Sequence, residues 1–344
     1  MNGLAVDGIE AERGDFRLGP VSFAVPAGTA TVLLGPSGAG KTTLLRALAG
    51  FLPLRAGTIR FDGAPVDTLP PEHRGFGFVP PNLGLFPHRR VRWNVRYPLA
   101  LRGAPDAEAR TDAWIERFGL GALAHRFIEA LSSGERQRVA MARALAAEPR
   151  ALLWDEPLAA LDVESRDTLV RLLRDLLETE RIPLLLVTHD PTTAFALASR
   201  VVVVGHGRVR VDRTPEELAH GPLDRFLARF LGYENLYGRD ELTAPGIGPI
   251  GTRFAAWAGA AGLAVPPDAI AWRAGSGGPN EARVVALRWT AAGWVVALRQ
   301  GPLTLHAVVP ARTTPGVRVG DPVSVEIDPA HVKPLEEFPD GGVR

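Results

Sequence analysis

The sequence contains no cysteine in its 344 residues, which excludes a disulfide framework, a zinc knuckle and thiol catalysis. Lysine is almost absent as well: Lys41 and Lys333 are the only two, so nearly all positive charge is arginine. The 39 basic and 38 acidic side chains leave a formal net charge of +1. No overall field therefore draws the chain to nucleic acid or to an anionic membrane surface, and we expect no nucleic-acid partner.

Long hydrophobic runs are also missing. The longest apolar stretch, Phe254 to Val265, is too short to span a bilayer and ends at a pair of prolines. Residues 1–10 contain two acids and lack the basic and apolar regions of a secretory signal. If the protein works at a membrane, we expect it to dock onto other subunits there.

The length favours two domains, and the pattern changes along the chain accordingly. From residue 1 to about 212, apolar runs alternate with helical patterns, which predicts a parallel sheet with helices on its faces. Residues 164–180 place leucines on one helical stripe, typical of a helix packed on such a sheet. The runs with the hydrophobicity of strands buried on both sides are Thr31–Leu34, Ala151–Trp154, Pro183–Val187 and Val201–Val204.

Two further regions differ from this pattern. An insertion from about Asn82 to Ala144 has helical periodicity in residues 107–118 and 135–145, which predicts a helical subdomain. Beyond about residue 235 the runs are short, rich in Val and Leu, and separated by Gly, Pro and Asp, which predicts a small all-β domain. Its expected strands are Arg283–Leu287, Gly293–Leu298, Leu303–Val309 and Pro322–Ile327.

A glycine-rich segment, GPSGAGKTT, joins the first buried run to a helical pattern. Glycine lets the backbone wrap a phosphate with its amide donors, and the following helix points its positive end at the same anion. Lys41 would bind the β- and γ-phosphates, and Thr42 would offer its hydroxyl to Mg²⁺. The alternative is a glycine-rich turn that binds nothing. The residues expected around the phosphates are Gly35, Pro36, Ser37, Gly38, Ala39, Gly40, Lys41, Thr42 and Thr43.

Two acids, Asp155 and Glu156, end the buried run Ala151–Trp154. This position lies at the carboxyl edge of a parallel sheet, where ligands of such folds bind. Asp155 is then placed to hold Mg²⁺, and Glu156 is the candidate general base for an attacking water. The alternative is that both acids only open a solvated loop.

Three further motifs follow in order. LSSGERQRVAMARAL (Leu131–Leu145) resembles the signature of ABC transporter ATPases, LAALD (Leu158–Asp162) resembles their D-loop, and His189 resembles their switch histidine. Together with the phosphate loop and the acid pair, these elements cover residues 1 to about 235. The chain therefore resembles the ABC transporter ATPase family.

The resemblance implies an α/β P-loop NTPase fold, with a RecA-like core and a helical subdomain at about 82–144, within an ATP-binding domain of residues 1–234. It implies ATP and Mg²⁺ as cofactors. Ser132 and Gly134 would meet the γ-phosphate bound by a second copy of the chain, Asp162 would cross the dimer seam, and His189 would hold the γ-phosphate and the attacking water.

The family's partners are a second ATPase subunit, two membrane permeases and, indirectly, a solute-binding protein. The resemblance thus places the chain peripherally on the cytoplasmic face of the cell membrane. The segment Asn82 to Pro98 would dock onto the permeases. Two other readings stay open: a soluble ABC ATPase acting on ribosomes or DNA, which the single cassette and absence of a basic patch disfavour, and a regulator that binds ATP with weak hydrolysis.

Two neighbouring residues are candidates for covering the adenine base, and the sequence does not decide between them. Phe16 is the candidate for stacking on the base, but it could equally be a core residue of the first strands. Arg13 lies close by and could also cover the base.

Three positions depart from the family pattern. Pro81 replaces a Gln that normally reaches Mg²⁺, and proline has no side-chain donor or acceptor for this task. Ser133 replaces the first Gly of the signature, which is tolerable if its φ is negative. Trp154 stands where the family prefers a smaller aliphatic residue.

Residues 235–344 resemble the TOBE or OB-like accessory domain of importer ATPases. The phrases FLGYENLYGR (Phe230–Arg239) and LHAVVPARTTPG (Leu305–Gly316) most resemble importers of molybdate and tungstate, while sulfate, ferric iron, polyamines and sugars are alternative cargoes. A barrel that serves dimerisation alone is the other reading. Arg312, Thr313 and Thr314 could bind an oxyanion or simply form a turn.

Overall fold

The computed structural model describes residues 3–158, 161–220, 224–242, 260–275, 280–290 and 293–335. The chain divides into two compact units, Met1–Ala219 and His220–Arg344. Each unit is described by itself.

The first unit is built on a six-stranded sheet with the order β10-β9-β3-β8-β7-β6. Neighbouring strands from β9 to β6 are parallel, and β10 is antiparallel to β9. Every residue of β3, β7 and β8 is buried, so the four apolar runs are confirmed as central strands. The strands are β3 (Ala30–Leu34), β6 (Phe76–Val79), β7 (Ala151–Asp155), β8 (Leu184–Thr188), β9 (Arg200–Gly205) and β10 (Arg208–Arg213).

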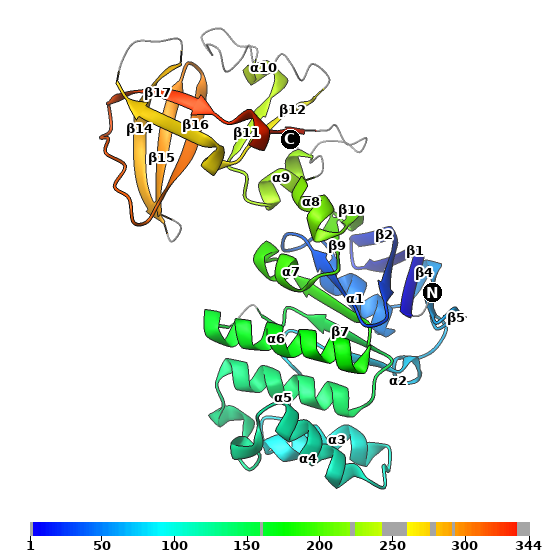
Figure 1. Cartoon of the computed structure of the whole chain (residues 1–344). Helices are drawn as coiled ribbons and strands as arrows, with labels where there is room; N and C mark the ends of the chain where they lie inside the picture. The colour runs from blue at the N-terminus through cyan, green and yellow to red at the C-terminus, as the bar shows by residue number, and fades with distance from the viewer. Residues whose placement is uncertain are drawn as a thin grey trace. The chain divides into compact units, whose positions relative to one another are not determined.

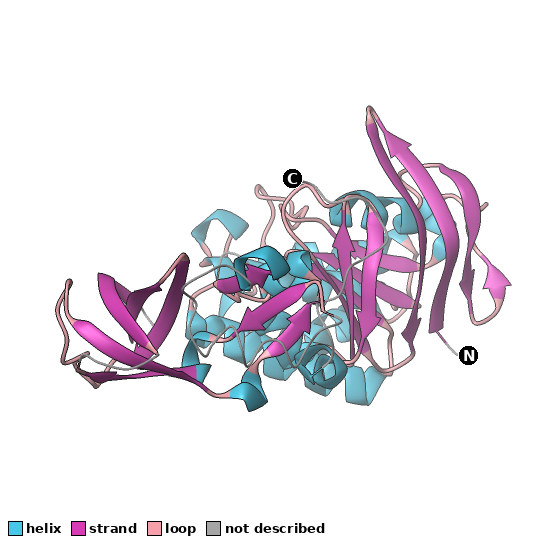
Figure 2. Cartoon of the chain, turned by 90° about the horizontal axis from the view of Figure 1, so that it is seen from above, coloured by secondary structure: helices cyan, strands magenta, loops and turns pink. Residues whose placement is uncertain are grey.

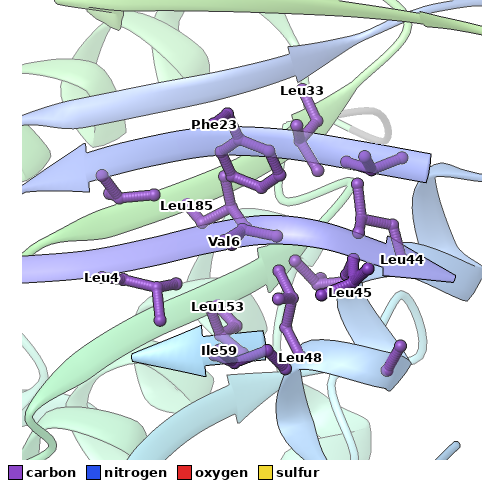
Figure 3. Close-up of a cluster of buried hydrophobic side chains, with 14 of the residues drawn as sticks. Leu4, Val6, Phe23, Leu33, Leu44, Leu45, Leu48, Ile59, Leu153 and Leu185 are labelled. Atoms are coloured by element: carbon purple, nitrogen blue, oxygen red, sulfur yellow. The ribbon is translucent and has the colours of Figure 1, made fainter. Parts of the chain in front are cut away.

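A second, antiparallel sheet with the order β2-β1-β4-β5 belongs to the same unit. Its strands are β1 (Gly3–Arg13), β2 (Phe16–Pro26), β4 (Leu54–Phe61) and β5 (Ala64–Pro65). Helix α1 (Lys41–Ala49) shares one core with both sheets, as Figure 3 shows for the side chains of Leu44, Leu45 and Leu48. This shared core fixes the start of α1 against both sheets.

Helices complete the first unit. Helices α3, α4 and α5 lie together in Figure 1, and α5 runs alongside α6. The helical periodicity predicted for 107–118, 135–145 and 164–180 is confirmed by α4, α5 and α6. The helices are α2 (Pro71–Arg74), α3 (Val91–Leu101), α4 (Ala107–Arg117), α5 (Ser133–Ala146), α6 (Val163–Glu180), α7 (Pro191–Leu197) and α8 (Pro215–His220).

The second unit contains two antiparallel sheets with the orders β11-β12-β18 and β13-β17-β14-β15-β16. The strands of this unit are strongly curved in Figure 2, and its buried side chains form one hydrophobic core. The predicted strands are confirmed. Its elements are α9 (Arg225–Phe230), β11 (Asn235–Gly238), α10 (Arg239–Leu242), β12 (Gly262–Val265), β13 (Ile270–Ala274), β14 (Glu281–Thr290), β15 (Gly293–Gln300), β16 (Leu303–Pro310), β17 (Pro322–Ile327) and β18 (Lys333–Leu335).

Among the described residues, no helix is both long enough and apolar enough to cross a membrane. Of the apolar stretch that begins at Phe254, residues 254–259 lie outside the described residues, and its last four residues form β12 (Gly262–Val265).

Candidate nucleotide site

The glycine-rich loop follows β3 directly and ends where α1 begins at Lys41. Gly38 and Gly40 adopt φ values of 81° and 101°, a left-handed conformation that other residues rarely take. Lys41 is 6% exposed, and its ammonium donates hydrogen bonds to the carbonyl oxygens of Gly35 at 2.7 Å and Pro36 at 3.0 Å. Burial lowers the pKa of Lys41, and the negative charges of Glu156 and Asp155 oppose that shift. The loop thus holds a buried lysine that makes no ion pair with any residue in the described part of the chain.

A cavity of about 500 Å³ opens above this loop. Its size lies within the range of small-molecule sites in proteins. The walls come from the loop, the first hairpin and the end of β7, so three separate parts of the chain converge on one space. The lining residues are Arg13, Phe16, Ser37, Gly38, Ala39, Gly40, Lys41, Thr42, Thr43 and Glu156.

Asp155 ends β7 and is 0% exposed. Within the described residues, neither of its carboxylate oxygens has a hydrogen-bond partner of normal geometry. Burial raises the pKa of Asp155, while the nearby Thr42 hydroxyl and Lys41 ammonium oppose the rise. A buried carboxylate without a partner is costly, so this position is suited to an added cation.

The donor set at this point fits a nucleotide-bound Mg²⁺. The described residues contain no group of three or more His, Asp or Glu side chains that could enclose a metal by themselves. Mg²⁺ commonly takes only one or two protein ligands and completes its shell with phosphate and water. Asp155 and Thr42 supply such a partial set.

Glu156 and His189 come together at the carboxyl ends of adjacent strands β7 and β8. Nδ1 of His189 lies 2.8 Å from Oε2 and 3.0 Å from Oε1 of Glu156. Glu156 has a φ of 52°, which is uncommon for a residue other than glycine and is typical of strained functional positions. Its backbone N–H is fixed by the carbonyl of Val187 at 3.0 Å. The acid and the histidine are therefore held as a pair.

Ser132 and Gly134 lie at the start of α5 and do not line the cavity. Ser132 caps the helix: its hydroxyl accepts from the N–H of Glu135 at 3.3 Å, and its own N–H donates to that carboxylate at 2.7 Å. A capped helix start presents free N–H groups and positive dipole charge to an anion. In one chain, this helix start is separate from the cavity of the phosphate loop.

Asp162 also lies away from the cavity and caps α6, accepting hydrogen bonds from the N–H of Ser165 at 2.8 Å and from its hydroxyl at 2.9 Å. Ser165 in turn approaches the signature, since a Cβ on Gly134 would lie 3.2 Å from its Oγ. Ala159 and Ala160 of the predicted D-loop lie outside the described residues.

The departures from the family pattern have distinct structural settings. Pro81 is exposed in the loop after β6, where it offers no polar group. Ser133 is the first residue of α5 and is not among the residues with positive φ, so its side chain causes no backbone strain there. Trp154 is 0% exposed, its Nε1 has no partner in the described part of the chain, and nothing in the structure explains it.

Sequence reasoning missed two polar side chains that hold the loop after Pro81. Arg143 on α5 donates to the carbonyls of Leu83 at 2.8 Å and Gly84 at 2.7 Å. Asn94 is 0% exposed and bonds to both the N–H and the carbonyl of Phe86. The Arg143 contacts join residues 59 and 60 positions apart, so no local pattern could have revealed them, whereas Asn94 and Phe86 are only 8 positions apart.

The predicted docking segment carries an aromatic cluster. Phe86, Trp93 and Tyr97 lie with ring centroids 4.9 to 5.1 Å apart. The guanidinium of Arg89 lies 4.8 Å from the Trp93 ring centre. In the second unit, the predicted anion-binding residues Arg312, Thr313 and Thr314 are all exposed, and Thr313 donates its N–H to Pro310 in a turn.

Comparison with known proteins agrees with this geometry. Residues 18–159 match the family model described as ABC transporter. The chain is 47% identical over 208 residues to the Fe(3+) ions import ATP-binding protein FbpC of Streptomyces avermitilis, covering 60% of each chain. It is 40% identical over 232 residues to the sulfate/thiosulfate import ATP-binding protein CysA of Nocardia farcinica, covering 67% of this chain and 70% of that protein.

The similarity covers only part of several relatives: the chain spans 60% to 64% of the length of the first curated relatives that it matches. A solved structure, the dimeric post-hydrolysis state of the ATP-binding cassette MJ0796 bound to ADP and Pi, has a TM-score of 0.55 and 25% identity. It covers 62% of this chain and 98% of that one. The chain has the P-loop fold of these cassettes and belongs to the ABC transporter family.

Proposed function

We propose that the chain is the ATP-binding and ATP-hydrolysing subunit of an importer. The observation that carries this proposal is the division of the site. The phosphate loop and Glu156 line one cavity, while Ser132 and Gly134 lie outside it at a capped helix start. Each chain then holds two half-sites, and two copies bound head to tail complete two nucleotide sites.

Roles follow from the positions of the side chains. The loop amides and Lys41 would bind the β- and γ-phosphates, with Lys41 exchanging its two carbonyl partners for phosphate oxygens. Asp155 and Thr42 would hold Mg²⁺, which supplies charge neutralisation of the phosphates. Glu156 would accept the proton of the attacking water, and His189 would orient that carboxylate and reach the γ-phosphate.

We further propose the partner subunits of the chain, its location in the cell and its domain bounds. The second copy's Ser132 and Gly134 would close the γ-phosphate, with Asp162 at the seam. The aromatic cluster after Pro81 would dock onto two membrane permeases, fed by a solute-binding protein, at the cytoplasmic face of the membrane. Residues 1–234 would form the ATPase domain, with its helical subdomain at about 82–144, and residues 235–344 an OB-like accessory domain.

The cargo proposal is an inorganic ion. Relatives named for ferric ions and for sulfate/thiosulfate support that class. Molybdate or tungstate is the finer proposal, and it rests on the C-terminal phrases alone. Uptake of each labelled ion by cells that carry or lack the chain would decide among them.

The test of the core proposal uses Glu156→Gln. We expect the variant to bind Mg-ATP and accumulate as a two-chain complex in light scattering, because binding persists while hydrolysis stops. The exposed Glu178→Gln on α6 is the matched control and should behave as wild type. If wild type shows no affinity for ATP and the Glu156→Gln variant stays monomeric, the proposal is wrong.

A second candidate, an ATP-gated regulator with weak hydrolysis, is favoured by one observation. Pro81 is exposed and carries no polar group where the family uses Gln. Phosphate release by the purified chain separates the two: a regulator would bind ATP without multiple turnovers, whereas an importer subunit would turn over.

A further inference from the structure

The end of the first hairpin carries two side chains toward the cavity. In the register of β1 and β2, Arg13 pairs with Phe16 across the turn Gly14–Asp15. Directly opposite residues of an antiparallel pair project from the same face. The next pair on that face, Ala11 and Leu18, is 1% and 2% exposed. Arg13 therefore occupies the core-facing side of the hairpin, at the point where that side ends at the cavity.

Phe16 is committed to packing. A Cβ placed on Gly40 of the phosphate loop would lie 2.6 Å from Cζ of Phe16, and one on Gly207 would lie 3.3 Å from the same atom. Gly207 itself is tied to both neighbours, since its N–H donates to Ala39 at 2.9 Å and its carbonyl accepts from Gly19 at 2.8 Å. The tip of the Phe16 ring is thus wedged between the phosphate loop and a turn, which fixes the hairpin.

Arg13 has no such commitment. It is exposed, lines the cavity, and within the described residues makes no hydrogen bond or ion pair. On the opposite face of the same hairpin, Glu12 pairs with Arg17 at 3.4 Å and with Arg55 at 2.9 Å. The charges of that face are matched, while the guanidinium at the cavity is left for a ligand.

A guanidinium has two chemistries available here. Its plane is weakly hydrated and stacks on aromatic rings, and its charge can pair with phosphate. Phosphate already has Lys41 and the loop amides at the other end of the cavity. We infer that Arg13, and not Phe16, is the residue that covers the adenine base of ATP, while Phe16 wedges the hairpin in place. This inference rests on the proposed binding of ATP.

The test compares two ligands by calorimetry with full-length chain and Mg²⁺: ATP, which has a base, and inorganic triphosphate, which has none. Arg13→Ala should weaken ATP binding roughly tenfold, the usual worth of one base-stacking contact, and leave triphosphate binding unchanged. Arg13→Tyr should retain most of the ATP affinity because an aromatic ring can stack, whereas Arg13→Lys should not.

Two controls sharpen the result. Arg17→Ala removes an arginine of the same hairpin that is 85% exposed and faces away, and should leave both affinities unchanged. Phe16→Leu keeps bulk without a ring, so ATP affinity should be retained if Phe16 is a wedge. Unchanged melting temperatures of the Arg13 variants would show that the hairpin remains folded.

Several outcomes would overturn the inference. If Arg13→Ala weakens both ligands equally and Arg13→Lys restores them, Arg13 binds phosphate. If Arg13→Ala has no effect on ATP, or Phe16→Leu abolishes the base-dependent part of the affinity, Arg13 does not cover the base. These results leave ATP binding intact, whereas wild type that binds neither ligand would overturn the proposed function as well.

Discussion

Asp155 at the end of β7 and Asn235 at the start of β11 are both almost fully buried, at 0% and 1% exposure, but their polar atoms are treated differently. Asn235 donates to the carbonyls of Val265 at 3.1 Å and His306 at 2.8 Å, and accepts from the N–H of His306 at 2.6 Å. Asp155 has no partner of normal geometry for either oxygen within the described residues. Two equally buried side chains thus differ: the polar atoms of Asn235 in the second unit have hydrogen-bond partners, and those of Asp155 in the first unit do not.

The difference separates a structural role from a binding role. A buried polar group that is fully bonded stabilises a fold, while one left open costs free energy until a ligand arrives. The side-chain amide of Asn235 connects β12 and β16 by hydrogen bonds to their backbones. Burial raises the pKa of Asp155, while Thr42 and Lys41 oppose that rise, and a bound cation would offset its negative charge further.

The sharpest way to test this contrast is Asp155→Asn. We expect phosphate release to fall by about 100-fold or more, because the neutral amide is a poor ligand for Mg²⁺. The exposed Asp167→Asn on α6 is the matched control and should keep full activity. An Asp155→Asn variant that hydrolyses ATP at the wild-type rate would remove Asp155 from the metal site.

The same variant should stabilise the protein without nucleotide by about 1–3 kcal/mol near neutral pH, because it removes an uncompensated buried charge. The pKa of Asp155 is raised in the folded state, so the folded protein binds this proton more readily than the unfolded chain. The cost of the charge therefore applies above the raised pKa and is relieved as the pH falls through it. The stability gap between variant and wild type, measured by urea unfolding, should narrow on acidification.

The sequence could predict what depends on local pattern. The apolar runs became β3, β7, β8 and β9 because continuous hydrophobicity suits a strand buried on both faces. The phosphate loop and acid pair likewise stand in one short segment each. The contacts of Arg143 with Leu83 and of Asn235 with His306 could not be predicted, since they join residues 60 and 71 positions apart. No sequence pattern predicts the left-handed backbone conformation of Glu156 or the packing of the Phe16 ring against Gly40 and Gly207.

The structural role of Asn235 can be tested with the variant Asn235→Ala. The change removes three hydrogen bonds to the backbone of Val265 and His306, so we expect the second unit to lose about 3 kcal/mol of stability. Hydrogen exchange of the β16 amides would report the loss locally. Tyr237→Phe, which removes a hydroxyl that lies 2.7 Å from the Thr304 carbonyl and 3.2 Å from Oδ1 of Asn235, should cost about 1 kcal/mol. Equal effects of the two variants would contradict the assigned role of Asn235.

A smaller effect is expected from Pro81→Gln, which returns a polar group to an exposed loop position where the family normally carries one. We expect phosphate release to rise about two- to tenfold, as the side chain can orient water or metal. Pro87→Gln in the same loop serves as control. An unchanged rate would mean that proline at position 81 is neutral for hydrolysis.

The smallest expected effect concerns Gln300, a buried polar side chain of the second unit that, unlike Asn235, lacks hydrogen-bond partners among the described residues. It is 3% exposed at the end of β15, and neither amide atom has a partner in the described part of the chain. It shares the inward face of its strand with Val296 and Leu298, which are both fully buried. We therefore expect its two unpartnered amide atoms to cost stability. Gln300→Met should therefore raise the stability of the second unit by about 1 kcal/mol, measured by hydrogen exchange of β15, and leave ATP hydrolysis unchanged. A loss of stability would show that the Gln300 amide has hydrogen-bond partners. In that case, the missing partners of Asp155 would not by themselves indicate a ligand, and the argument for Mg²⁺ would rest on the nearby cavity and charges.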